Sequence, residues 1–256
     1  SVDHAPDDQR HAGGGPTERR RIRDVTLGLA SRPYLAALAA YRHALAQRNA
    51  ALRLAHRPGA SLDGVAAWEP LLARHGAELW ASRASWVSAR ATAYAAHCAA
   101  IGERLPAAMQ LRTPGAPEGA RDADALAAAL ERQRAHDVRR GLTHAGPHRD
   151  DLALSLDGRD LRLVGSAGQQ RTAAFALRLL EAATLREACG AAPVLLLDDP
   201  FAELDESSPA HILGLLGAGG QGQVVLALPP PSDVPPALSP LARCRIVDGQ
   251  VVMHGA

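Results

Sequence analysis

The stretch from Gly165 to Ala182, GSAGQQRTAAFALRLLEA, changes character after its sixth residue. Small and amide side chains open it, and alanine and leucine then recur as in an amphipathic helix. Ser166 is suited to cap that helix, and Gly168 lets a ligand approach the backbone closely. The free N–H groups of a first helical turn and the helix dipole attract anions such as phosphate. We therefore predict an anion-binding helix start, although an ordinary N-cap also accounts for Ser166 taken by itself.

A second informative stretch, PVLLLDDPFAELD, runs from Pro193 to Asp205. Its apolar run predicts a central strand buried on both faces, and that strand ends in Asp198 and Asp199. Acidic residues at the carboxyl edge of a parallel strand lie where ligands bind in open α/β sheets. Solubility or helix capping also explains acids at a strand end, so the pair alone leaves both interpretations open.

The region around these two stretches, 141–256, alternates between strand and helix patterns. DLALSLDG with RDLRLV, and later RCRIVDGQVVM, predict hairpins that turn on Asp-Gly. Between them the pattern predicts the long helix, the buried strand, a helix in SPAHILGLLG and another buried strand in QVVLAL. Such alternation is typical of an α/β domain.

The preceding region, 31–140, has the apolar spacing of long helices. A first helix begins near Pro33 and ends at HRPGA, 56–60. Its apolar residues recur at three, four and seven positions on one face: Leu35, Leu38, Tyr41, Leu45 and Leu52. Residues 1–30 show no steady periodicity, so we assign them no element and interpret them as a tail or the remnant of a preceding lobe.

A second helical region spans about 65–105, with Gly76 as a candidate break. TPGAPEG at 113–119 is a turn-rich linker, and the pattern from Asp122 to Arg140 predicts a third helix that Gly141 stops. The length of the second region suggests an arm or a coiled hairpin. We expect the first 140 residues to be almost entirely helical.

Charge is distributed unevenly along the 256 residues. All 28 basic residues are arginine; residues 31–140 carry a net charge of +6 and residues 141–256 carry −5. A basic helical part next to an acidic part suggests nucleic-acid contact by the former, but an ordinary solvated helix surface explains the charge equally well.

Composition also sets expectations about compartment. Cys98, Cys189 and Cys244 form no CxxC pair and have no histidine at zinc-site spacing. No apolar run is long enough to span a membrane, and the first thirty residues do not resemble a signal peptide. We expect a soluble cytoplasmic protein with reduced thiols and no membrane partner.

Together, SAGQQRTAAFALRLLEA and PVLLLDDPFAELD resemble the signature motif, Walker B strand and D-loop of ATP-binding-cassette ATPases of the SMC type. The similarity is greatest to the RecF family of DNA repair ATPases. THAGPHRDDL at 143–152 resembles the segment that opens the second ATPase lobe of that family. PYLAALAAYRHALAQRNAAL at 33–52 resembles its first arm helix, and GGGPTERRRIRD at 13–24 resembles the segment before the arm.

The resemblance implies the carboxyl-terminal lobe of an α/β ABC-type ATPase at 141–256, with an all-α arm inserted at 31–140. In this family two heads close around two nucleotides, and the signature of one head meets ATP held by the other. Ser166, Gly168 and Gln169 would then contact the γ-phosphate of that ATP.

The same resemblance assigns roles to three acids. Asp198 would serve Mg²⁺, Asp199 would be the catalytic acid, and Asp205 in the D-loop would cross to the second head. It gives no secure role to the charged segment His148–Asp151, for which a loop entering a strand is the simple explanation.

Three features depart from the family pattern. A Walker A loop needs GxxxxGK[ST], and this chain contains no lysine, so the amino-terminal Walker A lobe is expected to be absent. PPPSDVPP at 229–236 follows the last parallel strand, where the family has a polar switch residue, and proline lacks an N–H donor. Ala167 replaces a residue that is often larger and polar. We expect the chain alone to bind ATP weakly and hydrolyse little.

Two functional hypotheses follow. The first is a RecF-like DNA repair and recombination ATPase in which DNA binding is coupled to ATP-driven head dimerisation, with a second head and recombination mediator proteins as partners. The chain would then be a fragment, the product of a late start, or a genuine half-ATPase. The alternative is a non-catalytic DNA-binding or protein-interaction derivative of the same family. The missing lysine favours it, and the joint retention of Ser166, Gly168, Asp198, Asp199 and Asp205 speaks against it.

Overall fold

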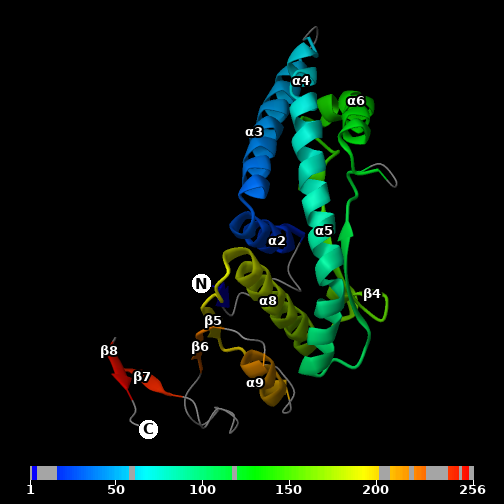
Figure 1. Cartoon of the computed structure of the whole chain (residues 1–256). Coiled ribbons are helices and arrows are strands. Elements are labelled where there is room, and N and C mark those ends of the chain that lie inside the picture. The colour runs from blue at the N-terminus through cyan, green and yellow to red at the C-terminus, as the bar shows by residue number, and fades with distance from the viewer. Residues whose placement is uncertain are drawn as a thin grey trace.

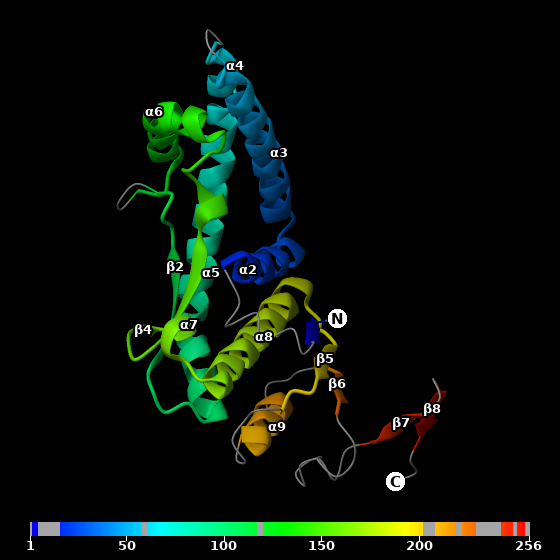
Figure 2. The ribbon, with the colours of Figure 1, turned by 180° about the vertical axis from the view of Figure 1, so that it is seen from behind.

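The structure, a computed structural model, describes residues 2–4, 16–57, 61–116, 120–201, 208–218, 222–228, 242–247 and 250–253. Figure 1 shows a long arm, in which α3 and α5 run side by side, above a lobe that holds α8, α9 and a small sheet. The view from behind in Figure 2 shows that β2 runs along α5, whose lower end packs on α8 and α9. The helix α5 therefore belongs to both parts.

Three long helices build the arm: α3 (Arg32–Ala55), α5 (Glu69–Ile101) and α6 (Ala123–Arg140), with the short α4 (Asp63–Ala66) between the first two. The Ser31 hydroxyl caps α3 by accepting the N–H of Tyr34 at 3.3 Å. Asp122 caps α6 in the same way, and Gly141 ends α6 with a left-handed φ of 67°. The first and third helices predicted from the sequence are confirmed.

The candidate break at Gly76 is wrong, because α5 runs through this position without interruption. Gly76 is buried where α6 crosses α5, and a Cβ there would collide with the Leu126 side chain. The glycine therefore permits close helix packing. The helix is instead interrupted earlier, at residues 67–68 between α4 and α5.

The expectation of an almost entirely helical first 140 residues is also wrong. After α5 the chain forms β2 (Ala107–Arg112), which pairs antiparallel with β3 (Asp151–Leu156) in a register that sets Met109 opposite Leu154. Both side chains are 3% exposed and join the core beside α5. A partner strand some forty residues away thus determines β2, and local periodicity does not report it.

The first predicted hairpin is only partly confirmed. β3 turns at Asp157 and Gly158 into β4, but β4 (Arg159–Asp160) has two residues and is followed by the short helix α7 (Leu161–Val164). The Asp160 carboxylate accepts the backbone N–H of Arg162 at 3.1 Å, which starts this helix. An N-cap therefore overrides the alternating pattern of RDLRLV.

The lobe contains a parallel sheet in the order β1 (Val2–His4), β5 (Leu195–Asp198), β6 (Val224–Ala227). The long helix α8 (Ala167–Cys189) and the helix α9 (Ser208–Ala218) accompany it, as predicted. β5 is central, also as predicted. β6 was expected to be buried, but Val225 is 45% exposed, because β6 has no further strand beside it in the described part of the chain.

Residues at both ends complete the fold. The region 1–30, to which the sequence assigned no element, contains β1 and the helix α2 (Pro16–Ala30), which packs against α8, β3 and α3. The predicted final hairpin is confirmed as β7 (Cys244–Val247) and β8 (Gln250–Met253), and its turn lies outside the described residues.

One continuous apolar core connects arm and lobe. Trp80, Tyr94 and Ile101 of α5 are 0% exposed within it, and leucine and alanine supply most of the rest. Such packing makes α5 the rigid link between the two parts. Among the helices of the described residues, none has the length and apolar character needed to cross a membrane.

Candidate functional site

The amino end of α8 is held by a reciprocal capping box. The Ser166 hydroxyl accepts the N–H of Gln169 at 3.2 Å, and the Gln169 side-chain oxygen accepts the N–H of Ser166 at 3.0 Å. Both residues use acceptors for this purpose, so the Ser166 O–H and the Gln169 NH₂ keep their hydrogens for an external acceptor. Ser166 is exposed and Gly168 is half-buried, so an anion can reach this turn.

The loop before α8 is tightly constrained. Gln170 donates its side-chain N–H to the Gly165 carbonyl at 3.0 Å, so this amide supports the loop. A Cβ on Gly165 would lie 2.6 Å from the backbone oxygen of Leu161, which only glycine avoids. The position of the helix start is therefore fixed before any ligand arrives.

The second predicted group lies at the carboxyl end of the central strand. Asp198 ends β5 and is half-buried, and Asp199 follows with a left-handed φ of 43°. The backbone N–H of Asp199 donates to the Ala227 carbonyl at 2.9 Å, which holds the turn against β6. Such backbone is uncommon for residues other than glycine, asparagine and aspartate, carries some strain even for aspartate, and is often found at functional sites.

Arg171, which was not predicted from the sequence, joins the two groups. It is 4% exposed on α8, two positions after Gln169, and its guanidinium donates to the Asp199 carbonyl at 2.5 Å. The helix that carries the signature thus directly holds the backbone of the predicted catalytic acid. An arginine inside an apolar helix pattern was the signal that could have revealed it.

Two of the three acids predicted to act at the nucleotide site lie within the described residues. Asp198 and Asp199 provide the carboxylates that Mg²⁺ prefers, so these residues fit the predicted ion. Asp205 lies outside the described residues.

A different set of possible metal ligands, His136, Asp137 and His144, gathers in the arm. It is the one such group of three within the residues that the structure describes. Asp137 already accepts hydrogen bonds from Arg48 at 2.7 Å and from His144 at 2.8 Å. A guanidinium this close opposes a cation, so we assign no metal to the group.

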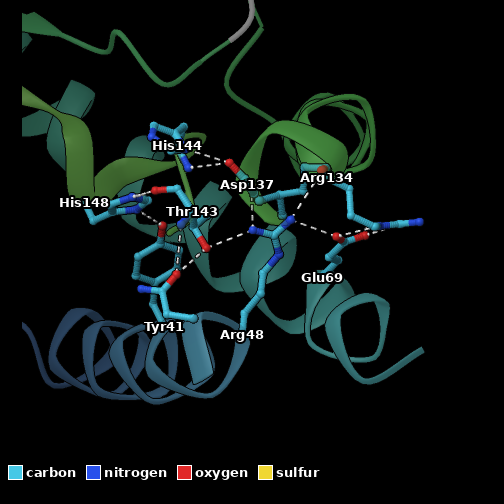
Figure 3. Close-up of polar contacts among 10 residues, drawn as sticks. Tyr41, Arg48, Glu69, Arg134, Asp137, Thr143, His144 and His148 are labelled. Atoms are coloured by element: carbon cyan, nitrogen blue, oxygen red, sulfur yellow. Dashed lines mark hydrogen bonds and ion pairs between the residues drawn. The ribbon is translucent and has the colours of Figure 1, made fainter. Parts of the chain in front are cut away.

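Side chains of the segment His148–Asp151 make hydrogen bonds and ion pairs within the fold. His148 lies between the Tyr41 hydroxyl, 2.7 Å from Nδ1, and the Thr143 carbonyl, 2.9 Å from Nε2 (Figure 3). A carbonyl only accepts, so Nε2 carries the proton and Nδ1 accepts from Tyr41. Burial lowers the pKa of His148 to about 4, which keeps the ring neutral.

The two acids of this segment tie the lobe to the arm and to α2. Asp150 accepts from the Trp80 indole at 3.0 Å and from Arg83 at 2.7 Å, both on α5. Asp151 pairs with Arg19 at 2.6 Å. These contacts make the segment the structural root of the arm.

Figure 3 also shows a buried ion network inside the arm. Arg48, 0% exposed on α3, pairs with Asp137 of α6 at 2.7 Å and with Glu69 of α5 at 2.9 Å. It also donates to the Thr143 hydroxyl at 2.8 Å, and Arg134 makes a second pair with Glu69. Every named partner belongs to the protein, so the network positions helices and leaves no charge for a ligand.

Comparison with known proteins identifies the family. The chain is 35% identical over 252 residues to the DNA replication and repair protein RecF of Herpetosiphon aurantiacus, a match that covers 96% of this chain and 64% of that protein. It is 34% identical to RecF of Thermomicrobium roseum, covering 96% of this chain and 67% of the relative. The chain belongs to the RecF family. The resemblance inferred from the signature and Walker B stretches is thereby confirmed.

Solved structures support the same conclusion. A structure described as the recombination mediator protein RecF-ATP in the RecFOR pathway matches with a TM-score of 0.82 and 26% identity, covering 99% of this chain and 67% of that one. The corresponding RecF-ATPrS structure gives 0.81. The ABC-type ATPase fold with an inserted arm is confirmed.

A scan against protein-family models finds no match. The chain spans 64% of the length of the Herpetosiphon RecF and 59% of that of Symbiobacterium thermophilum.

Proposed function

We propose that this RecF-family chain supplies the signature half of a composite ATP site in a DNA repair ATPase. One observation carries the proposal: the capping box at the exposed start of α8 leaves the Ser166 hydroxyl and the Gln169 amide as donors. A γ-phosphate offers the matching acceptors, and Gly168 leaves space for it beside the backbone. The nucleotide itself would be held by a second ATPase head, which is the first partner that we propose.

In this arrangement Asp198 would hold Mg²⁺, and Asp199 would act as the catalytic acid by orienting the attacking water. Bound Mg²⁺ supplies positive charge beside the phosphate oxygens. Arg171 acts through Asp199, because it fixes the carbonyl of that residue from the signature helix. We also propose that Asp205 in the D-loop crosses to the second head.

DNA is the proposed macromolecular ligand, and burial in the fold excludes some arginines from binding it. Arg48 and Arg83 are buried in ion pairs and are not available. Near the far end of the arm, Arg53 lies against Gly141, the residue that follows Arg140, and both arginines are exposed. Exposed arginines at helix ends suit contact with DNA phosphates, and such binding weakens as salt concentration rises.

We also propose protein partners and a cellular compartment, on the basis of the RecF family. Related structures are described as the recombination mediator protein RecF in the RecFOR pathway, and this supports other recombination mediator proteins of that pathway as partners of a complete assembly. A cytoplasmic location with no membrane partner agrees with such a role.

A non-catalytic derivative of the same family is the second candidate. One observation favours it: PPPSDVPP follows β6 where the family has a polar switch residue. In that case DNA or protein binding would persist without nucleotide turnover.

ATP hydrolysis by the chain, alone and with the amino-terminal ATPase lobe of a RecF relative, separates the two candidates. We expect background turnover alone and measurable turnover after addition of the lobe, which Asp199→Asn abolishes and Asp124→Asn, on the exposed face of α6, does not. Turnover by the isolated chain, or insensitivity to Asp199→Asn, would contradict the composite site. Failure to gain turnover with preserved DNA binding would favour the non-catalytic derivative.

A further inference from the structure

A cleft at the corner between α2 and α3 takes no part in the nucleotide site. It has a volume of about 650 Å³, is open to solvent, and is also lined by Arg83 of α5 and by Pro147 and His148. Clefts that bind small ligands typically measure roughly 300–1,000 Å³. The cleft is therefore large enough to take several side chains of a partner.

Its walls expose bulky aliphatic side chains. Val25 is 46%, Leu29 63% and Leu35 53% exposed. Arg21, Val25 and Leu29 are spaced by four residues and share one face of α2. Leu35 of α3 adjoins that face, because a Cβ on Gly28 would lie 3.5 Å from its Cδ1 atom. Contiguous apolar exposure of this kind marks an interaction surface.

The rim of the cleft is positively charged. Arg21 is exposed on α2, and the Arg42 side chain is 64% exposed on α3, 3.6 Å from Asp24. Asp24, the one acid among the lining residues, already accepts hydrogen bonds from Tyr34 at 2.6 Å and Arg83 at 3.0 Å. Its charge is thus largely balanced within the fold, and the rim favours an anionic partner.

The floor argues against a nucleotide or a free phosphate as the occupant. Tyr41 is 2% exposed and its hydroxyl is bound to His148, so no aromatic face is open for a base to stack on. The Arg83 guanidinium is occupied by Asp150 and the Pro147 carbonyl. The available cations therefore lie at the rim and do not converge on a single point.

We propose that this cleft binds an acidic, leucine-rich segment of a partner protein. Aliphatic side chains of that segment would pack on Val25, Leu29 and Leu35, and its carboxylates would pair with Arg21 and Arg42. This is the pattern of an amphipathic segment in a groove, with apolar anchors for affinity and charges for orientation. The inference concerns a surface separate from the signature and from the acids that follow β5.

The test begins with a random peptide library displayed on phage and selected on the full chain. We expect the selected sequences to combine Asp or Glu with Leu, Ile or Phe. Synthetic copies should then bind with a Kd of about 1–100 μM by fluorescence anisotropy. Leu29→Glu and Arg42→Glu should each weaken binding by about tenfold or more. Peptides without acidic residues, or no enrichment over an uncoated surface, would overturn the proposal.

Two controls establish whether the peptide binds in the cleft. Leu163→Glu alters a leucine of α7 that is 80% exposed and lies outside the cleft, so it should leave peptide binding unchanged. Arg42→Glu should bind more tightly a peptide whose acid is replaced by arginine. Equal loss with Leu163→Glu, or no response to the charge swap, would refute binding in the cleft. If a labelled DNA oligonucleotide displaces the peptide and depends on Leu29 and Arg42, the surface binds nucleic acid and the proposal is wrong.

Discussion

The buried ion network of the arm and the polar groups of the lobe site contain similar side chains but use them in opposite ways. Arg48 is 0% exposed and donates to Asp137 and Glu69 of the arm and to Thr143 just after α6. Ser166, in contrast, is exposed and keeps its hydroxyl hydrogen after capping α8. Buried polar groups whose hydrogen bonds are all made within the protein therefore stabilise the fold. Polar groups that are held in place but keep exposed donors or acceptors are candidates for ligand binding.

The largest effect is expected from Arg48→Met, which removes the centre of the network. Asp137 and Glu69 would keep buried carboxylates with fewer partners, so the free energy of unfolding should fall by about 3–5 kcal/mol. Urea denaturation followed by circular dichroism measures it. The matched control is Arg74→Met, whose arginine is 74% exposed beside Glu78 and should change stability by less than about 0.5 kcal/mol. A similar loss of stability in both variants would contradict the view that the buried network stabilises the arm more than an exposed ion pair does.

A second prediction uses pH, because His148 is buried and neutral. Its pKa is lowered to about 4, whereas an unfolded histidine has a pKa of about 6.5, so protons favour the unfolded chain between these values. The stability that neutral His148 contributes is present above pH 6.5 and is lost as pH falls toward 4. The loss should be at most about 3 kcal/mol.

The matched variant is His148→Gln, which keeps one donor and one acceptor but does not titrate. Urea unfolding at pH 7 and at pH 4.5 should show a larger acid loss for the wild type than for this variant. An equal loss in both would mean that other groups, and not this histidine at the root of the arm, control the acid response.

The comparison also explains what could be predicted from the sequence. The capped helices and the strand that ends in Asp198 follow from local pattern, and so does the helix start at Ser166. β2 and the link from Arg171 to Asp199 were missed because both depend on contacts between residues far apart in the chain. The path of α5 through Gly76 was also misjudged, because helix packing against Leu126 decides it. Local patterns therefore predicted the helix and the strand that carry the proposed site residues, and tertiary contacts decide how those residues are held.

A smaller effect is expected at the start of α8. Ser166→Ala removes the side-chain acceptor for the Gln169 N–H, which should lower the free energy of unfolding by about 1 kcal/mol. Ser166→Asp restores an acceptor and should recover most of that stability, but it places negative charge where the phosphate would bind. If the lobe site is open to ligand, the aspartate variant should fold well and fail to support turnover with an added amino-terminal lobe. Full turnover would show that the helix start does not face phosphate.

The smallest effect on stability is expected for substitutions of Asp199, and whether stability rises or falls is informative. A left-handed φ of 43° is unfavourable for aspartate and free of strain for glycine, so Asp199→Gly should raise stability by about 0.5 kcal/mol. Asp199→Asn should leave stability within about 0.5 kcal/mol of the wild type, because asparagine tolerates the same backbone. Both variants should lose turnover with an added amino-terminal lobe. A residue whose removal stabilises the fold and abolishes activity is retained for function. If thermal and urea unfolding instead show that either variant loses more than about 1 kcal/mol, Asp199 is part of the architecture and resembles Arg48 more than Ser166.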